Sequence, residues 1–232
     1  RKTISRQFKV YDYGVRTVID LRKPDEAKRE PSLAGDRAVV YRNLAIEGDS
    51  TEASGAISRA KTRAEVYCLV LDYHAARIAA VMRALLQAPL GGVVIHCQAG
   101  KDRTGMIAGL LLELAGVPRQ RIAEDYALSQ RCLWPLYEAI VQVRGDEGES
   151  DPWLKPIAKP ETMLEMLDYV DERYRGIGRY FRHVGLTDDE VMAYTLAFSE
   201  AGLGGANIHK TINLSAIRAH HFTIESFTQP QT

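Results

Sequence analysis

The stretch VVIHCQAGKDRTG, residues 93–105, predicts the centre of the fold and of its chemistry. The apolar run GVVIHC at 92–97 has the length and β-branched content of a buried central strand. The run RTGMIAGLLLELA at 103–115 is typical of a helix, which Gly116 and Pro118 end. A strand, a tight loop and a helix in this order indicate an α/β sheet with a site at a strand's carboxyl end.

The loop between these two elements carries a cysteine and an arginine, Cys97 and Arg103. Gly100 gives the loop the freedom to form a tight cradle whose successive N–H groups turn inward toward an anion. The start of the helix adds its dipole, and the planar fork of Arg103 suits two phosphate oxygens. These positive surroundings favour a Cys97 thiolate beneath a bound phosphate. We therefore predict that phosphate is bound by Gln98, Ala99, Gly100, Lys101, Asp102 and Arg103.

Outward from this loop, hydrophobic periodicity predicts further strands and helices. We expect strands at 15–22 and 37–46, and helices at 24–30, 64–87, 119–145, 159–183 and 186–198, with Thr187 as the N-cap of the last. The polar, Gly/Ser-rich stretch 47–63 predicts a long loop or mobile segment. Together these elements predict one α/β domain at 1–201, with a central, mostly parallel sheet flanked by helices, and a tail of unknown arrangement at 202–232.

Composition narrows the class of protein. Lys and Arg (30) balance Asp and Glu (30), so no global field attracts nucleic acid or an anionic membrane. The chain shows neither an apolar run long enough to span a membrane nor a signal peptide, which predicts a cytoplasmic protein or one secreted without a recognisable signal. Its three cysteines argue against a disulfide scaffold, and no ligand spacing suggests a metal, so we expect neither a metal nor another cofactor.

The pattern HCxxGxxRTG at 96–105 resembles the phosphate-binding loop of the protein-tyrosine-phosphatase superfamily, whose shared core is Cys-x5-Arg. The fuller HCQAGKDRTG is similar to bacterial tyrosine phosphatases that share a GKxR loop with phosphoinositide phosphatases. Segments 14–22, 115–129 and 160–191 also resemble that bacterial family, so the resemblance covers most of the chain. It implies a protein-tyrosine-phosphatase-like fold and the hydrolysis of phosphate monoesters.

The resemblance also implies a two-step displacement. Cys97 attacks phosphorus to form a cysteinyl-phosphate, which water hydrolyses to inorganic phosphate, while Arg103 and the loop amides hold the phosphate oxygens. Thr104 resembles the family's hydroxyl donor, which helps the sulfur to leave. The alternative is that Thr104 is an ordinary residue of the first helical turn. His96 is expected to order the loop from behind.

The leaving oxygen needs a proton, so a carboxylic acid must reach the site. The family takes this acid from a loop after the strand that precedes the long helix, and Asp49 in AIEGDS best matches that placement. Glu47 is the nearest competitor, and a solvated loop position is the alternative for Asp49. Asp102 could share the acid role, orient Arg103 or position water.

Three functions fit these residues. The first is a phosphotyrosine phosphatase, with tolerance of phosphoserine and phosphothreonine as in dual-specificity enzymes. The second is a phosphoinositide phosphatase, suggested by Lys101 and Asp102, because Lys101 at the mouth of the site favours substrates with a second anionic group. A solvated cation is an equally good interpretation of Lys101. The third is a binding module that captures phosphoproteins without turnover.

Residues outside the loop have more ordinary interpretations. Asp20 and Arg22 in VIDLR suggest a buried ion pair that supports the loop. Cys68 and Cys132 are expected to be packed apolar positions. The segment 133–160, with its two tryptophans, could form a helical lid over the site, or its aromatic residues could pack on an ordinary helix pair.

Overall fold

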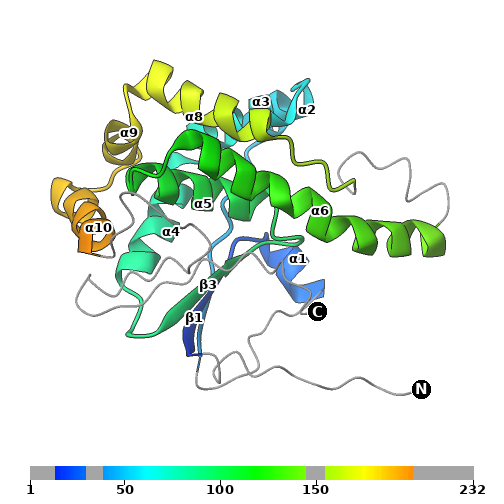
Figure 1. The fold of residues 1–232 in the computed structure, drawn as a ribbon, viewed down its shortest axis with the longest axis horizontal. Helices are drawn as coiled ribbons and strands as arrows, with labels where there is room; N and C mark the ends of the chain where they lie inside the picture. The colour runs from blue at the N-terminus through cyan, green and yellow to red at the C-terminus, as the bar shows by residue number, and fades with distance from the viewer. Residues whose placement is uncertain (1–13, 30–38, 145–154, 201–232) are drawn as a thin grey trace.

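The computed structural model describes residues 14–29, 39–144 and 155–200. Three parallel strands, β1 (Val15–Asp20), β2 (Val40–Asn43) and β3 (Gly92–His96), form a sheet in the order β2-β1-β3. Asp20 pairs with Asn43 on one side and His96 on the other, so all three strands end at one edge (Figure 1). The predicted α/β architecture is confirmed.

The order of the strands corrects one prediction. Within the described residues β1 is the middle strand, and β3, which was predicted to be central, pairs only with β1. The reason is that an apolar run reports how deeply a strand is buried and not where it stands in the sheet. The side chains of β3 are indeed largely buried.

Helices surround this sheet and supply most of the core. Their bounds are α1 (Pro24–Arg29), α2 (Thr51–Ser58), α3 (Arg63–Tyr73), α4 (Ala75–Leu86), α5 (Asp102–Leu114), α6 (Arg119–Arg144), α8 (Pro160–Tyr174), α9 (Ile177–His183) and α10 (Asp188–Glu200). The main hydrophobic cluster joins these helices, α1 excepted, to Ile19 and Ile95 of the sheet. A smaller cluster around Val15 and Val18 forms on the opposite face of β1. Figure 1 shows the C-terminal half of α6 extending beyond the other elements.

The prediction of a long loop at 47–63 is wrong, because helix α2 lies within it. Ser50 caps this helix by accepting a hydrogen bond from the backbone N–H of Ala53 at 3.2 Å. Ala53 is also completely buried, so packing supports the helix. The glycine and serine content of the segment therefore concealed a short capped helix, in which Gly55 is an interior residue.

Two predicted helices are each divided in the structure. The predicted helix 64–87 breaks at His74, whose backbone is not helical, into α3 and α4. The predicted helix 159–183 breaks at Arg175 and Gly176, both with positive φ, into α8 and α9. Apolar periodicity continues across such short breaks and does not reveal them. Thr187 does cap α10 as predicted, since its Oγ1 accepts a hydrogen bond from the N–H of Glu190 at 3.1 Å.

Candidate active site

The phosphate loop follows β3 at the carboxyl edge of the sheet. Cys97 is the first residue after the strand, and its side chain is 6% exposed. Gly100 has φ +71°, and an added Cβ would meet no atom within 4 Å. The glycine is therefore needed for its backbone conformation and not for space. Helix α5 begins at Asp102, so Arg103 lies in its first turn.

Arg103 is held by a carboxylate that the sequence did not suggest, Glu26 of α1. Nη1 and Nη2 of Arg103 donate to Oε2 and Oε1 of Glu26 at 2.7 and 2.8 Å. This pair uses one end of the guanidinium, and a guanidinium has five N–H donors. The edge formed by Nε and the second N–H of Nη2 is engaged by none of the described residues. Glu26 thus fixes the plane of Arg103 and leaves a fork that suits a phosphate.

The charges of this pair stabilise each other. The hydrogen bonds from Arg103 lower the pKa of Glu26 against the opposing effect of burial. Burial acts to lower the pKa of Arg103, but the interactions with Glu26, Cys97 and Glu47 outweigh burial and raise that pKa. Lys23 completes the arrangement, because its backbone N–H donates to Oε2 of Glu26 at 2.9 Å. Arg103 is therefore a permanent, oriented cation above the thiol loop.

The predicted buried ion pair between Asp20 and Arg22 is confirmed. Nη2 of Arg22 lies 2.7 Å from Oδ2 of Asp20, and Tyr41 donates to the same oxygen at 2.8 Å. Burial by itself raises the pKa of a carboxyl, but the hydrogen bonds from Arg22 and Tyr41 hold the pKa of Asp20 below its ordinary value. Nη1 of Arg22 donates to Oε1 of Gln98 at 3.3 Å. The pair thereby ties the end of β1 to the phosphate loop.

His96 is the last residue of β3, directly before Cys97. Its Nδ1 is 2.9 Å from the carbonyl oxygen of Cys97. A carbonyl only accepts hydrogen bonds, so the proton is assigned to Nδ1. Nε2 is buried and lies 3.8 Å from Oδ2 of Asp20, which is too long for a hydrogen bond. His96 thus contacts the backbone of the loop.

Asp102 is held by two residues of α3. Its Oδ1 accepts hydrogen bonds from Nη1 of Arg63 at 2.6 Å and from the hydroxyl of Tyr67 at 2.7 Å. The Tyr67 hydroxyl also lies 2.7 Å from that of Tyr126 on α6. Burial, with Asp102 nearby, raises the pKa of Tyr67 far above its ordinary value, so the phenol stays protonated. Asp102 therefore joins the phosphate loop to two helices.

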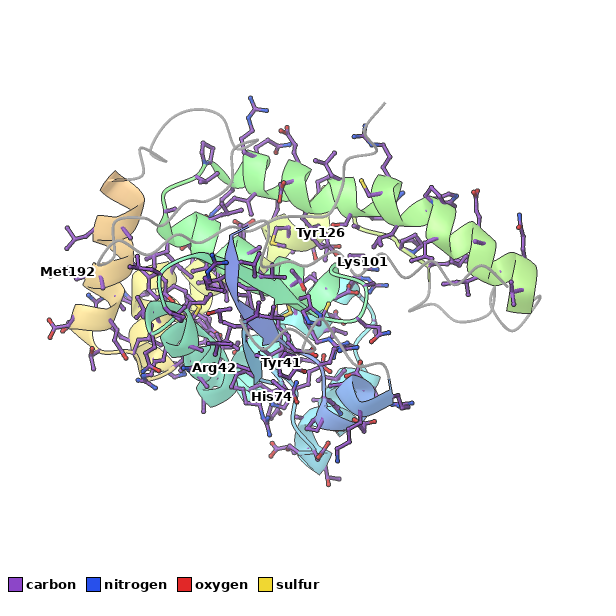
Figure 2. All side chains as sticks on the ribbon, turned by 90° about the horizontal axis from the view of Figure 1, so that it is seen from below. Tyr41, Arg42, His74, Lys101, Tyr126 and Met192 are labelled. Atoms are coloured by element: carbon purple, nitrogen blue, oxygen red, sulfur yellow. The ribbon has the colours of Figure 1, made fainter. Side chains whose placement is uncertain are left out.

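Lys101 is buried, which makes its interpretation as a solvated cation wrong. Its side chain is 2% exposed, and Nζ donates to the carbonyl oxygens of Ile157 and Lys155 at 3.3 and 3.4 Å. Oδ2 of Asp102 is 3.5 Å from the same Nζ. Burial lowers the pKa of Lys101, although Asp102 opposes this effect. Lys101, which is labelled in Figure 2, thus connects the loop to the segment that precedes α8.

The last two residues of the motif have different surroundings. Oγ1 of Thr104 is buried and has no hydrogen-bond partner within the described part of the chain. At Gly105 an added Cβ would lie 2.9 Å from Cδ2 of Tyr126. Gly105 is therefore required for close packing of α5 against α6, whereas Thr104 has an unused hydroxyl beside Arg103.

The two candidate acids after β2 lie in the segment 44–50. Asp49 is 98% exposed at its side chain, and its Oδ1 lies 3.6 Å from Nζ of Lys23. Glu47 is partly buried, and its charge acts on the guanidinium of Arg103. The structure thus brings Glu47 into electrostatic range of the site, while the carboxylate of Asp49 points into solvent.

The segment proposed as a lid is only partly described. Helix α6 continues as far as Arg144 and includes Pro135. The rings of Trp134 and Tyr137 lie 5.5 Å apart on this helix. Residues 145–154 lie outside the described residues, as do those of the predicted tail. The lid therefore stays a prediction.

Residues 3–198 match the sequence model of the tyrosine phosphatase family. The chain belongs to this family. A tyrosine-protein phosphatase of Nostoc commune is 29% identical over 199 residues, which cover 82% of this chain and 68% of that protein. The triple specificity protein phosphatase PtpB of Mycobacterium tuberculosis is 31% identical over 221 residues, which cover 77% of this chain and 80% of that protein.

Membership of the tyrosine phosphatase family confirms the resemblance found in the sequence. It also confirms the predicted class of enzyme, a phosphatase whose substrates are phosphoproteins. Within the described part of the chain, no helix has both the length and the apolar character needed to cross a membrane.

Proposed function

We propose that this tyrosine phosphatase hydrolyses phosphotyrosine in proteins through a phosphorylated Cys97. One observation carries the proposal. Arg103 is oriented by the end-on pair with Glu26, and its Nε–Nη2 edge is left to bind a phosphate beside the buried thiol. A planar fork fixed in this way recognises two oxygens of a phosphate monoester at once.

In the first step, the thiolate of Cys97 attacks phosphorus, and the bond from phosphorus to the substrate oxygen breaks. The N–H groups of Gln98, Ala99, Gly100, Lys101 and Asp102 hold the phosphate oxygens together with Arg103. Water attacks the cysteinyl-phosphate in the second step and releases inorganic phosphate. We assign to Thr104 the stabilisation of the departing sulfur, since its buried hydroxyl has no other partner within the described residues.

The leaving oxygen takes up a proton in the first step. Three carboxylates come into consideration as its source, Asp49, Glu47 and Asp102, and their surroundings differ. Arg63 and Tyr67 hold Asp102, which favours a role in positioning the loop. Asp49 pairs with Lys23 in solvent, and Glu47 lies closer to the charge of Arg103.

Phosphotyrosine is favoured over phosphoinositides as the substrate. The phosphoinositide alternative depended on Lys101 as a cation at the mouth and on Asp102. Nζ of Lys101 is instead buried against backbone carbonyls, and Asp102 is engaged by Arg63 and Tyr67. Hydrolysis of phosphoserine and phosphothreonine stays part of the proposal, because the similar PtpB is named a triple specificity protein phosphatase. A reactive thiol works best where thiols stay reduced, so we place the enzyme in the cytoplasm or, after secretion, in a comparably reducing compartment.

The proposal is tested by phosphate release from a phosphotyrosine peptide, a phosphoserine peptide and a soluble monophosphorylated phosphoinositide. We expect the phosphotyrosine peptide to be the best substrate, and Cys97→Ser to lower release by roughly 10⁴-fold or more. The variant should still bind inorganic phosphate, which calorimetry measures. Cys132→Ser is the matched control and should keep normal activity.

Other outcomes would change the proposal. Faster hydrolysis of the phosphoinositide would make lipid head groups the substrate. Phosphate binding without turnover of any of the three compounds would leave a phosphoprotein-binding module. Full activity in Cys97→Ser would contradict the covalent mechanism.

A further inference from the structure

Three segments leave the carboxyl edge of the sheet side by side. The N–H of Leu21 donates to the carbonyl of His96 at 2.8 Å, and the N–H of Ile46 donates to the carbonyl of Leu21 at 3.4 Å. Cys97, Arg22 and Glu47 are the residues that follow these three anchored positions. Neighbouring strands lie about 4.8 Å apart, so the backbones at Glu47 and Cys97 are separated by roughly 10 Å. A glutamate side chain and a phosphate monoester together span such a distance.

The carboxylates around this edge differ in what they bind. Asp20 is paired with Arg22 and Tyr41, and Glu26 with Arg103. Asp102 accepts hydrogen bonds from Arg63 and Tyr67, and Asp49 forms an ion pair with Lys23. Glu47 is the exception, because its carboxylate has no hydrogen bond or ion pair with any described residue.

This difference decides which carboxylate can exchange a proton. A carboxylate clamped by a guanidinium is stabilised in its charged form and gives up that pairing when it is protonated. A general acid must instead carry a proton in one step and release it in the next. Asp20, Glu26 and Asp102 are held by guanidinium groups, and Asp49 points into solvent, whereas Glu47 is partly buried and has no such pair within the described part of the chain.

Glu47 stands on a segment that is fixed on both sides. Ile46 is completely buried, and Nη1 of Arg77 donates to the carbonyl of Ala45 at 3.2 Å. The guanidinium of Arg77 also lies against Gly48, where an added Cβ would come within 2.8 Å of Nε. Ser50 then caps α2. Arg77 therefore contacts the backbone on both sides of Glu47, at Ala45 and at Gly48.

We propose that Glu47 is the catalytic general acid, and that Arg77 positions it by holding residues 45–48. The proposal rests on the phosphatase function stated above. As the bond from Cys97 Sγ to phosphorus forms, the bond to the leaving oxygen breaks and its electron pair stays on that oxygen. The carboxyl proton of Glu47 is transferred there. In the second step the Glu47 carboxylate takes a proton from the attacking water as the bond from sulfur to phosphorus breaks.

The charges at the site support this cycle. In the free enzyme the charges of Glu47 and Arg103 act on each other. A bound phosphate dianion neutralises the guanidinium and repels a second negative charge beside it. After the leaving group departs, the carboxylate is available as a base for water. One side chain can thus serve both steps.

The test compares two substrates whose leaving groups differ in their need for a proton. A phosphotyrosine peptide needs a proton on its phenol, whereas dinitrophenyl phosphate releases a stable anion without one. We expect Glu47→Gln to lower kcat/KM for the peptide by roughly 10²-fold, and for dinitrophenyl phosphate by less than about threefold. Arg77→Gln should lower the peptide rate by about tenfold with the same dependence on the leaving group, because the acid is displaced and not removed.

Matched variants separate this role from general damage. Glu52→Gln on α2 and Arg59→Gln at the C-cap of that helix make the same changes nearby and should leave both substrates unaffected. If Glu47→Gln slows both substrates equally, or neither, Glu47 is not the acid. If Asp49→Asn gives the leaving-group dependence instead, the role belongs to Asp49. A wild-type enzyme that hydrolyses neither substrate would contradict the phosphatase function itself.

Discussion

The phosphate loop at 97–103 and the segment at 44–50 leave the same edge of the sheet, yet their charged side chains are held in opposite ways. Around the phosphate loop, Arg103 is fixed by Glu26 and Asp102 by Arg63. In the segment 44–50 the backbone is fixed, but Glu47 has no hydrogen bond or ion pair among the described residues and Asp49 is almost fully exposed. The difference matches two tasks. Binding a phosphate requires charges that do not move, whereas proton transfer requires a carboxyl free to change its charge.

The largest effect is expected from removing a paired charge beside the phosphate loop. Asp20→Asn leaves Arg22 buried without its counter-ion, which should lower the free energy of unfolding at neutral pH by about 3–5 kcal/mol. Denaturant unfolding measures this change. Asp49→Asn is the matched control in the other segment and should leave stability essentially unchanged, because its pair with Lys23 is solvent-exposed.

Lowering the pH should reduce the difference in the free energy of unfolding between wild type and Asp20→Asn. The pKa of Asp20 in the folded protein lies below its ordinary value of 3.8. Its contribution to stability is therefore complete above that value and is lost as the pH falls through the lower folded-state pKa. A difference in unfolding free energy that stays constant, or grows, toward low pH would contradict the pairing described here.

The next effect concerns Arg103, the residue that we propose binds the phosphate. Arg103→Lys replaces a fork by a point charge, so kcat/KM should fall by roughly 10²- to 10³-fold for every substrate. Steady-state kinetics with several phosphate esters measures the loss. Arg121→Lys, on the exposed surface of α6, is the control and should behave as wild type. Near-normal rates in Arg103→Lys would overturn the assignment of Arg103 as the phosphate-binding residue.

The smallest effect is expected for Glu26, which orients Arg103 but is not proposed to bind the phosphate itself. Glu26→Gln keeps the shape of the side chain but loses one acceptor and the charge, so the plane of Arg103 is less well fixed. We expect kcat/KM to fall by about tenfold, equally for good and poor leaving groups. Inhibition by inorganic phosphate should weaken in parallel. A dependence on the leaving group would assign Glu26 a part in proton transfer.

The sequence predicted the phosphate loop because all of its parts are contiguous. Cys97, Gly100 and Arg103 lie within one short stretch, and their spacing between a strand and a helix is visible without coordinates. The ion pair of Asp20 with Arg22 was predicted for the same reason, since the two residues are close neighbours in the chain.

The partners of the loop could not be predicted in this way. Glu26 and Arg63 reach Arg103 and Asp102 across 77 and 39 positions of sequence, and only the packing of α1 and α3 brings them there. Lys101 was expected at the mouth of the site because lysine is usually exposed, but the segment 155–157 covers it. Arg77 and Glu47 lacked any signal that joined them, since their connection runs through backbone atoms at Ala45 and Gly48.

The contrast between a paired binding loop and an unpaired acid is tested most directly by the leaving-group dependence of kcat/KM. This quantity reports the step in which the leaving group departs, and it is measured for a series of aryl phosphates of graded phenol acidity. In Arg103→Lys the rates should fall in parallel with those of wild type, with an unchanged slope. In Glu47→Gln the slope should steepen, with the loss concentrated in the least acidic phenols. Equal slopes in wild type and both variants would contradict the division of tasks between the two segments.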